Sequence, residues 1–318
     1  MRNIVLLFIL GLSAGVQAQH VKTMRMSKVA TVSEQIGIAN VAISYSRPAV
    51  NGREGKIWGE LVPYGFVDYH YGTSKAAPWR AGANENTTIE FSTDVTIEGK
   101  PLAAGNYGFF VGMGAETATL VFSKNNNSWG SFYYDAAGDA LRVEVPVGKA
   151  NEPVEWLKYE FTGETDTSAV AVLEWEKVKI PFTIAVCLKK TQIAAYRYAF
   201  NSGEFYEYWQ NMQQAVDFCL VNNVNLTEGL EWADRSIHTY FGDANFQTLS
   251  TYAGLLGMAG RKREADSVMK LAWPKGNAND VFSYGYKMHR TAEKGDHRGE
   301  GCNADVNNLA VLSSGRVE

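Results

Sequence analysis

Hydrophobic and polar residues alternate along the chain between about residues 28 and 187. Such alternation predicts β-strands that bury one face. It is clear at Val41–Tyr45 and recurs at Ile89–Phe91, Val95–Ile97, Tyr107–Val111, Leu120–Phe122, Leu141–Val145, Leu157–Phe161, Ala171–Trp175 and Val178–Val186. Turn-forming runs such as Glu98–Pro101, Lys124–Ser128 and Thr162–Thr165 separate these sets. About nine short strands without helices between them predict an all-β antiparallel sandwich, jelly-roll-like in character.

The hydrophobic spacing becomes helical after Lys190. One apolar face includes Phe205, Trp209, Met212, Val216, Phe218 and Leu220, and Asn222 with Asn223 ends it. Asn225 with Glu228 has the spacing of a capping box. Further helices are expected at Phe246–Ala259 and from Glu264 to about Trp273, where Pro274 ends the helix. The spacing of Ala253, Gly260 and Ala265 resembles a tetratricopeptide hairpin. We therefore predict a small α-helical hairpin domain of three to five helices over residues 191–290, which makes the chain α+β overall with two domains.

The two ends of the chain differ from both domains. Residues 1–18 combine Arg2, the apolar run Ile4–Leu12 and the small-x-small sequence Val16–Ala18, a pattern typical of a signal peptide. We expect an exported protein, periplasmic or extracellular, that begins at Gln19. No later stretch approaches the ~20 apolar residues of a membrane span. Residues 293–318 form a polar tail without clear period, for which we expect poor order.

Composition and charge exclude several classes of function. The 318 residues are 46% hydrophobic, enough for a sizeable core, and the net charge of -4 offers no excess of cations for nucleic acid. Three cysteines, Cys187, Cys219 and Cys302, allow at most one disulfide within the chain. Cys187 and Cys219 lie in strand and helix patterns, where buried inert thiols are usual. Neither metal-ligand spacing nor a glycine-rich nucleotide-binding loop is present, so we expect no metal and no cofactor.

Groups able to fix a ligand are densest between Trp79 and Glu85, directly before the strand at Thr87–Phe91. Together with Arg47, the residues Trp79, Arg80, Asn84 and Glu85 supply an aromatic face, guanidinium forks, an amide and a carboxylate. These are the parts of a site for a sugar or an anionic group. The competing interpretation is a buried polar network, with Arg47 or Arg80 paired to Glu85 and Trp79 in the core. The sequence leaves both interpretations open.

Several motifs resemble a bacterial family catalogued as domain of unknown function 2911. They are Ile43–Pro48, Gly52–Arg53, Ile57–Gly59, Leu61–Gly65, Trp79–Arg80, Gly82–Thr88, Trp129–Gly130 and the spacing of Asp139, Leu141 and Arg142. The resemblance covers about residues 24–187, within the predicted sandwich, and extends loosely to about 272. It implies a secreted protein of the kind found in Bacteroidota, often with a helical tail, and it implies no activity. Residues 66–78 are an insertion relative to this family. They predict a lid, an extra ligand contact or a surface loop.

Three functions fit these observations. The first is a non-catalytic binding module of the cell envelope that takes a small-molecule or glycan ligand at Arg47, Trp79, Arg80, Asn84 and Glu85. The second is a hydrolase of an envelope polysaccharide with Glu85 as acid or nucleophile, for which Asp135 or Asp139 would be the second carboxylate. The third is a structural docking protein whose helical domain binds a protein partner. A serine hydrolase is not supported, because the chain has no Gly-x-Ser-x-Gly elbow. We expect binding rather than catalysis.

Overall fold

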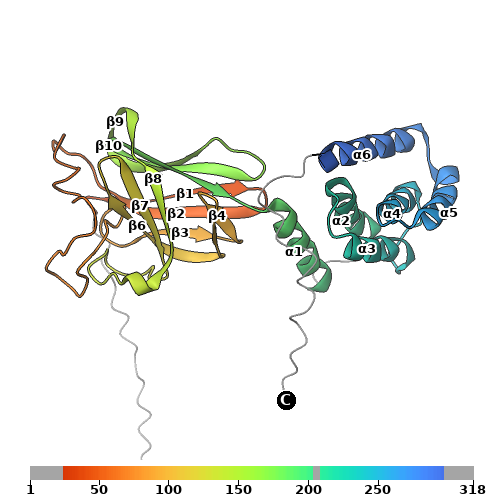
Figure 1. Ribbon diagram of the computed structural model, residues 1–318, viewed down its shortest axis with the longest axis horizontal. Coiled ribbons are helices and arrows are strands. Elements are labelled where there is room, and N and C mark those ends of the chain that lie inside the picture. The colour runs from red at the N-terminus through yellow and green to blue at the C-terminus, as the bar shows by residue number, and fades with distance from the viewer. Residues whose placement is uncertain (1–23, 203–207, 297–318) are drawn as a thin grey trace, which may run out of the picture.

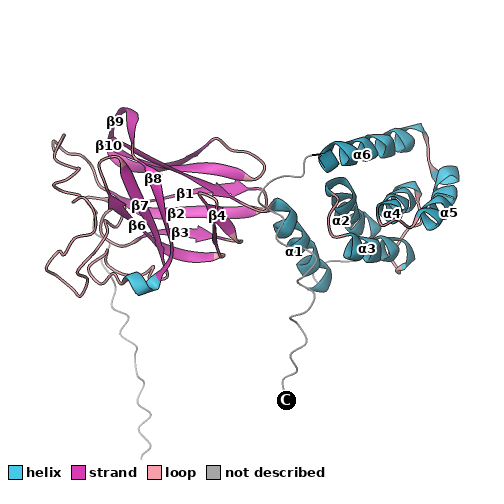
Figure 2. Cartoon of the chain, in the orientation of Figure 1, coloured by secondary structure: helices cyan, strands magenta, loops and turns pink. Residues whose placement is uncertain are grey.

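The computed structural model describes residues 24–202 and 208–296. The predicted signal peptide, and the predicted tail beyond residue 296, lie outside these ranges. The described chain has two parts, a pair of antiparallel sheets followed by a group of helices (Figures 1 and 2). This confirms the predicted α+β architecture. Within the described residues, no helix has both the length and the apolar character needed to cross a membrane.

The larger sheet has six strands in the order β1-β2-β3-β6-β7-β8. Their bounds are Lys28–Ile36, Ala39–Arg47, Thr87–Phe91, Gly105–Met113, Thr117–Ser123 and Asp139–Pro146. Every neighbouring pair is antiparallel, for example with Ile43 opposite Ile89 and Ile89 opposite Tyr107. Ile43 and Ile89 are fully buried. The alternation in the sequence therefore fixes which face of each strand meets the core.

The smaller sheet has four strands in the order β5-β4-β10-β9, with bounds Lys100–Leu102, Val95–Ile97, Ser168–Ala185 and Gly148–Thr162. Two predicted strands, Ala171–Trp175 and Val178–Val186, are parts of the one long strand β10. The strand is irregular between them, where its register against β9 shifts on either side of Glu176 and Glu176 has a φ of 53°. A β-bulge of this kind keeps a strand continuous while it changes which residues face inward.

The core lies between the two sheets and is rich in aromatic rings. Phe109, Phe122 and Phe182 form one group, in which the ring centroids of Phe109 and Phe182 are 5.5 Å apart. Phe109 and Phe122 come from the larger sheet, whereas Phe182 comes from β10. These contacts fasten the two sheets face to face.

In the part of the chain that the structure describes, six α-helices follow β10. Their bounds are α1 Leu188–Asn201, α2 Trp209–Asn222, α3 Leu226–His238, α4 Phe246–Met258, α5 Lys262–Ala272 and α6 Ala278–Asp296. Helices α2 to α6 pack together, and α1 leads out of the sandwich towards them (Figure 1). The predicted ends at Asn222 and Pro274 are confirmed, since Asn223 caps α2 in the left-handed conformation and Pro274 lies in a short 3₁₀ turn, η2, Trp273–Lys275.

Two details of the helical part differ from the sequence-based expectation. Asn225 precedes α3 but makes no capping hydrogen bond with its side chain, because its backbone is left-handed. The capping box lies instead at α4, between Asn245 and Thr248. Helix α6 also runs through residue 296, into the stretch predicted to be a polar tail. The likeness of Ala253, Gly260 and Ala265 to a tetratricopeptide hairpin stays a prediction.

The two described cysteines differ in state. Cys219, on α2, is free and fully buried, and burial raises the pKa of its thiol to about 12. It is the inert thiol that its helical position predicts. Cys187, which precedes α1, is disulfide-bonded, so the same expectation is wrong for this residue.

Candidate functional site

The candidate residues lie on a long connection, residues 48–86, between β2 and β3. Much of this connection forms loops at the end of the sandwich away from the helices (Figure 1). Single β-bridges tie it to the larger sheet, at Gly65 with Met113 and at Trp79 with Val111. A second loop, between β7 and β8, lies against it, because Asn86 donates from its backbone to the Ser128 carbonyl at 3.1 Å. The site is therefore built by loops that the larger sheet holds in place.

Trp79 is part of the core. It is only 8% exposed, stacks on Trp175 with ring centroids 6.1 Å apart, and meets Trp58 edge to face at 5.6 Å. Its indole N–H donates to the Gly82 carbonyl at 3.2 Å, so the polar atom of the ring is satisfied inside. The main contacts of this ring are thus with the protein, which agrees with the interpretation that Trp79 fills the sandwich core.

Arg80 is partly buried and has a different kind of partner. Its Nη1 donates to the Asn84 carbonyl at 2.6 Å, and its guanidinium lies over the Phe132 ring at 5.0 Å. Burial lowers the pKa of Arg80. Among residues 24–202 and 208–296, no carboxylate forms an ion pair with it. Arg80 therefore keeps a positive charge at the loop end of the sandwich that no described anion neutralises.

The backbone between Arg80 and Asn86 follows a tight path. Ala81 and Asn84 have φ values of 51° and 60°, in the left-handed region that residues other than glycine rarely adopt. A methyl group on Gly82 would lie 2.7 Å from the Thr87 Oγ1 atom, so only glycine fits there. The Ala81 carbonyl accepts hydrogen bonds from the Thr87 and Tyr159 hydroxyls at 3.0 and 2.8 Å. The loop is thus held in one conformation, with Asn84 contributing its backbone to Arg80.

Glu85 pairs with neither of the arginines considered from the sequence. Its carboxylate accepts two hydrogen bonds from Arg25, at 2.6 and 2.8 Å, and a weaker one from the Ser46 hydroxyl at 3.4 Å. Both members of the Arg25–Glu85 pair are 43% exposed. The hydrogen bond from Arg25 lowers the pKa of Glu85, which keeps this carboxyl ionised. Glu85 is therefore poorly suited to act as a general acid, which must hold its proton at the working pH.

We expect Glu85→Gln to have a small, pH-dependent effect on stability. A carboxyl whose pKa is lowered by folding adds stability above its ordinary pKa, and this is lost as the pH falls through the folded value. The exposed pair is screened by water, so the variant should melt within roughly 1–3 °C of the parent at pH 7. Below both pKa values the difference should vanish. Thermal melts of both proteins at a series of pH values from 7 downwards measure this, and a difference that grows as the pH falls would contradict it.

Arg47 lies at the end of β2 and connects the two sheets. Its Nε donates to the Leu157 carbonyl of β9 at 2.9 Å, and the Leu157 N–H donates to the Pro48 carbonyl at 3.0 Å. The hydrogen bonds of Arg47 and Arg80 thus go to different segments. The structure brings Arg80, Asn84 and Trp79 into one loop, whereas Arg47 acts at the junction with β9. Whether the five predicted residues bind a ligand stays a prediction.

The insertion at residues 66–78 is fastened to the loop that follows β7. Val67 and Ala77 exchange two backbone hydrogen bonds, at 3.0 and 2.8 Å. The backbone N–H groups of Thr73 and Ser74 both donate to the Phe132 carbonyl, at 3.1 and 3.0 Å. The insertion is therefore an ordered part of the loop end, next to Arg80.

Aromatic side chains surround Phe132 at this place. The rings of Tyr69 and Tyr71 meet the Phe132 ring edge to face at 5.9 and 5.0 Å. Tyr71 is 62% exposed, and Trp129, in the same loop as Phe132, is 57% exposed. Gly130, which follows Trp129, lies against the Arg80 guanidinium, where an added methyl group would clash. We call Arg80, Tyr69, Tyr71, Trp129 and Phe132 the aromatic platform.

The sequence pointed to part of this platform. Trp129, at a loop edge between an asparagine run and Gly130, differs from the tryptophans that lie in strand patterns, and Tyr69 and Tyr71 stand out in the insertion. Phe132 was missed, although the aromatic run Phe132–Tyr134 after Trp129 is a usable signal. Its contacts with Arg80 and the two tyrosines join segments about 50 to 60 residues apart. Only the folded chain brings them together.

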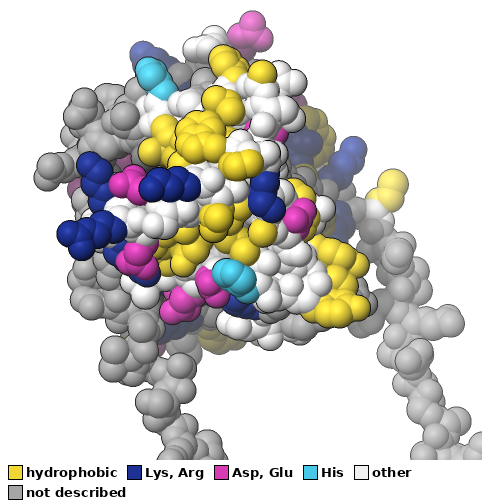
Figure 3. All heavy atoms as spheres, turned by 90° about the vertical axis from the view of Figure 1, so that its right-hand side faces the viewer, with side chains coloured by type: hydrophobic (Ala, Val, Ile, Leu, Met, Phe, Trp, Pro, Cys, Tyr) yellow, Lys and Arg dark blue, Asp and Glu magenta, His cyan; other side chains and the backbone are white. Residues whose placement is uncertain are grey.

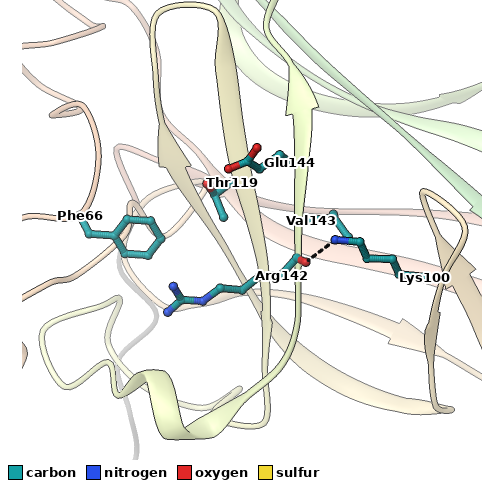
Figure 4. A pocket seen from close by; sticks show the side chains of 6 residues that line it. All are labelled: Phe66, Lys100, Thr119, Arg142, Val143 and Glu144. Atoms are coloured by element: carbon teal, nitrogen blue, oxygen red, sulfur yellow. Dashed lines mark hydrogen bonds between the residues drawn. The ribbon is translucent and has the colours of Figure 1, made fainter.

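A separate surface hollow of about 460 Å³ is lined by Phe66, Lys100, Thr119, Arg142, Val143 and Glu144. Arg142 extends towards Phe66, with its guanidinium 5.0 Å from the ring centroid, and Lys100 donates to the Arg142 carbonyl at 3.5 Å (Figure 4). Arg142 also donates to Asp139 and to the Tyr134 hydroxyl, both at 2.5 Å. Because the Arg142 guanidinium already pairs with Asp139, Arg142 offers less to an anionic ligand than Arg80 does.

The acidic residues of this region have structural partners. Across the described ranges, no three histidine, cysteine, aspartate or glutamate side chains are placed to hold a metal ion together. Asp139, named above for a hydrolytic pair, is held by Arg142 and Tyr134. Asp135 accepts from the Ala137 backbone N–H at 2.9 Å and so caps the 3₁₀ turn η1, Ala136–Gly138. Both aspartates thus have structural contacts.

Comparison with known proteins gives one match. No curated protein and no solved structure is similar to the chain. A family model described as "Protein of unknown function (DUF2911)" matches residues 27–184. The match ends at the last residues of β10 and leaves the helices outside. The sandwich of this chain, with the loops that form the candidate site, therefore belongs to the DUF2911 family of proteins of unknown function.

Proposed function

We propose that this chain is an exported, non-catalytic binding module that recognises an acidic glycan through the aromatic platform. The observation that carries the proposal is Arg80. It is a partly buried cation with no carboxylate partner among the described residues, and it lies over Phe132 beside exposed aromatic rings. A buried charge is costly unless an opposite charge or hydrogen bonds compensate it. A ligand carboxylate would supply the missing anion.

The exposed aromatic rings would bind the sugar rings of the same glycan. Sugars present flat apolar faces that pack on aromatic rings. Tyr71, whose ring meets Phe132, and Trp129, in the same loop as Phe132, offer such exposed rings. Because tyrosine and tryptophan have few rotatable bonds, ordering them on a ligand costs little entropy. In this assignment Arg80 grips the acidic group, Tyr71 and Trp129 stack on sugar rings, and Asn84 holds Arg80 in place.

The proposed export rests on the N-terminal pattern at residues 1–18. It places the protein where polysaccharides of the cell envelope are accessible. Catalysis on those polysaccharides is less well supported, since the pKa of Glu85 is lowered and its carboxylate is engaged by Arg25. Binding needs neither a proton donor nor a second carboxylate.

The test is binding of the full-length protein to uronic-acid-containing and neutral glycans. Trp129→Ala and Tyr71→Ala should each weaken binding to the acidic glycans at least about tenfold, as expected for an aromatic hot spot. Arg80→Gln should abolish the preference for acidic over neutral glycans. Trp156→Ala is a matched control, because Trp156 is 36% exposed but lies on β9, where Lys28 is its cationic neighbour. Binding that survives the three platform variants unchanged would overturn the proposal.

A second candidate function rests on a separate observation in the helical part. Large apolar side chains are exposed around α5, η2 and α6, with Leu271 at 62%, Trp273 at 50% and Phe282 at 77%. Apolar side chains gather on this outer face of the helices (Figure 3). Surfaces of this kind mark protein contacts. If the helices dock on a partner, Trp273→Ser with Phe282→Ser should abolish a co-purifying complex of the full chain, whereas the platform variants should leave it intact.

A further inference from the structure

Strand β1 forms an edge of the larger sheet, where β2 is its one hydrogen-bonded neighbour within the described residues. Two residues, Gly37 and Ile38, connect the strands, and Ile36 lies opposite Ala39 across this turn. In a two-residue hairpin the pair that closes the turn exchanges hydrogen bonds, and bonded and non-bonded pairs then alternate along the strands. The even-numbered residues of β1 therefore bond to β2, and the odd-numbered residues direct their N–H and C=O groups away from it.

The outer edge of β1 is open. No backbone hydrogen bond reaches it from the rest of the described chain. The Gln35 N–H donates to the carboxylate of its neighbour Glu34 at 3.0 Å, as expected for a group that points away from β2. Val29, Thr31 and Ser33 are exposed. A row of unpaired N–H and C=O groups of this kind is a template for a further strand.

The core-facing side chains of β1 indicate what kind of strand fits there. Ile36 is buried, whereas Ala30 and Val32 pack against the core but stay partly exposed. Lys28 and Glu34 lie in the same row of side chains and carry opposite charges. Among the described residues, neither of them forms an ion pair. An added strand therefore has to cover two small apolar side chains and supply one charge of each sign.

We propose that β1 pairs with β1 of a second copy of this chain, antiparallel and centred on Thr31. In this register Lys28 of each copy lies opposite Glu34 of the other, so that the two-fold axis produces two ion pairs. Ala30 of each copy lies opposite Val32 of the other, and the added strand covers both side chains. The larger sheets of the two copies become one continuous sheet.

Charge complementarity selects a second copy as the occupant of this edge. A charged side chain on the core side of an edge strand normally opposes the addition of another strand. Here Lys28 and Glu34 lie three residues on either side of Thr31, so an antiparallel copy presents the opposite order of charges. A shift of the register by two residues leaves both charges without a partner. The backbone agrees with this register, because Thr31 then forms a hydrogen-bonded pair with its own counterpart, and the ion pairs fall at non-hydrogen-bonded positions, where side chains lie closer.

Charge reversal and its rescue test the pairing in the full-length protein by sedimentation equilibrium. Lys28→Glu and Glu34→Lys should each weaken self-association at least about tenfold, because each substitution places two pairs of like charges across the axis. The double variant restores opposite charges and should regain a dissociation constant within about twofold of the parent. Lys56→Glu is the charge control, because Lys56 is exposed outside β1, and it should associate as the parent does. A parent that stays monomeric up to ~0.1 mM, or a double variant as weak as the single ones, overturns the proposal.

Disulfide trapping tests the register in the same full-length protein. At the two-fold axis the Cα atoms of the two Thr31 residues lie about 5.5 Å apart, within the range that a disulfide spans. Mild oxidation should therefore link most of the Thr31→Cys protein into a covalent dimer. Ser33→Cys is the matched control, because Ser33 is exposed on the same face but lies about 13 Å from its counterpart in this register, and it should not link. Equal linking at both positions, or at neither, overturns the register.

Discussion

Trp79→Ala is expected to lower the free energy of unfolding of the sandwich by about 3–5 kcal/mol. Trp79 is 8% exposed, and its ring stacks on Trp175 and meets Trp58 edge to face, so the substitution leaves a large cavity between the sheets. The indole hydrogen bond to Gly82 is lost as well, and with it one of the contacts that hold the loop before β3. Urea unfolding followed by tryptophan fluorescence and circular dichroism measures the loss.

Trp129→Ala is the matched control for this prediction. It removes the same side chain, but from a position that is 57% exposed. We expect its free energy of unfolding to stay within about 0.5 kcal/mol of the parent. If the two variants lose similar stability, Trp79 does not have the core role that its contacts indicate. Comparison of the two variants also separates folding from binding. Trp129→Ala should weaken glycan binding, whereas Trp79→Ala should lower the free energy of unfolding.

Gly72→Ala is expected to lower the free energy of unfolding by about 2–5 kcal/mol, and to weaken glycan binding. Gly72 has a φ of 75°, and a methyl group there would lie 2.3 Å from the Phe132 carbonyl oxygen. The alanine therefore adds left-handed strain of about 1–2 kcal/mol and a clash between two backbones that costs about 1–3 kcal/mol. To relieve the clash, the insertion must move away from the loop that carries Phe132. Thermal unfolding together with glycan titration measures both effects.

Gly55→Ala isolates the strain from the clash. Gly55 has a φ of 73°, close to that of Gly72, but an added methyl group would meet no atom within 4 Å. We expect it to lose about 1 kcal/mol and to bind glycans as the parent does. Equal losses at the two positions would mean that the contact between the insertion and Phe132 contributes nothing, and the platform would then lack its supporting loop.

The local spacing of hydrophobic residues was sufficient to predict the two-part architecture. The alternation at Val41–Tyr45 and Ile89–Phe91 reflects a strand with one face in the core, and this period does not depend on which strand lies next to it. The change of spacing after Lys190, and the ends at Asn222 and Pro274, follow from residues that favour or interrupt a helix. The capping box predicted at Asn225 is wrong, since Asn225 has a left-handed backbone and its side chain makes no capping hydrogen bond to the start of α3.

The roles of the candidate residues depended on tertiary structure. The cluster from Trp79 to Glu85 was visible as a dense set of polar and aromatic groups, yet the pairing of Glu85 with Arg25 joins residues 60 positions apart. No spacing rule predicts such a pair, because its two members lie on segments that only the fold brings together. For the same reason the sequence did not assign Phe132 to Arg80.

This chain's sequence thus determined a β-sandwich, a following helical part and a polar, aromatic loop before β3, because these depend on the period of hydrophobic residues and on turn-forming residues nearby. Tertiary structure alone decided which of those loop residues face inward and which face solvent. Trp79 and Trp129 both lie outside the regular strands, but the packing of two sheets buries the first and the edge of a loop exposes the second. Burial is a property of the whole fold, and it separates a residue that supports the site from one that can touch a ligand.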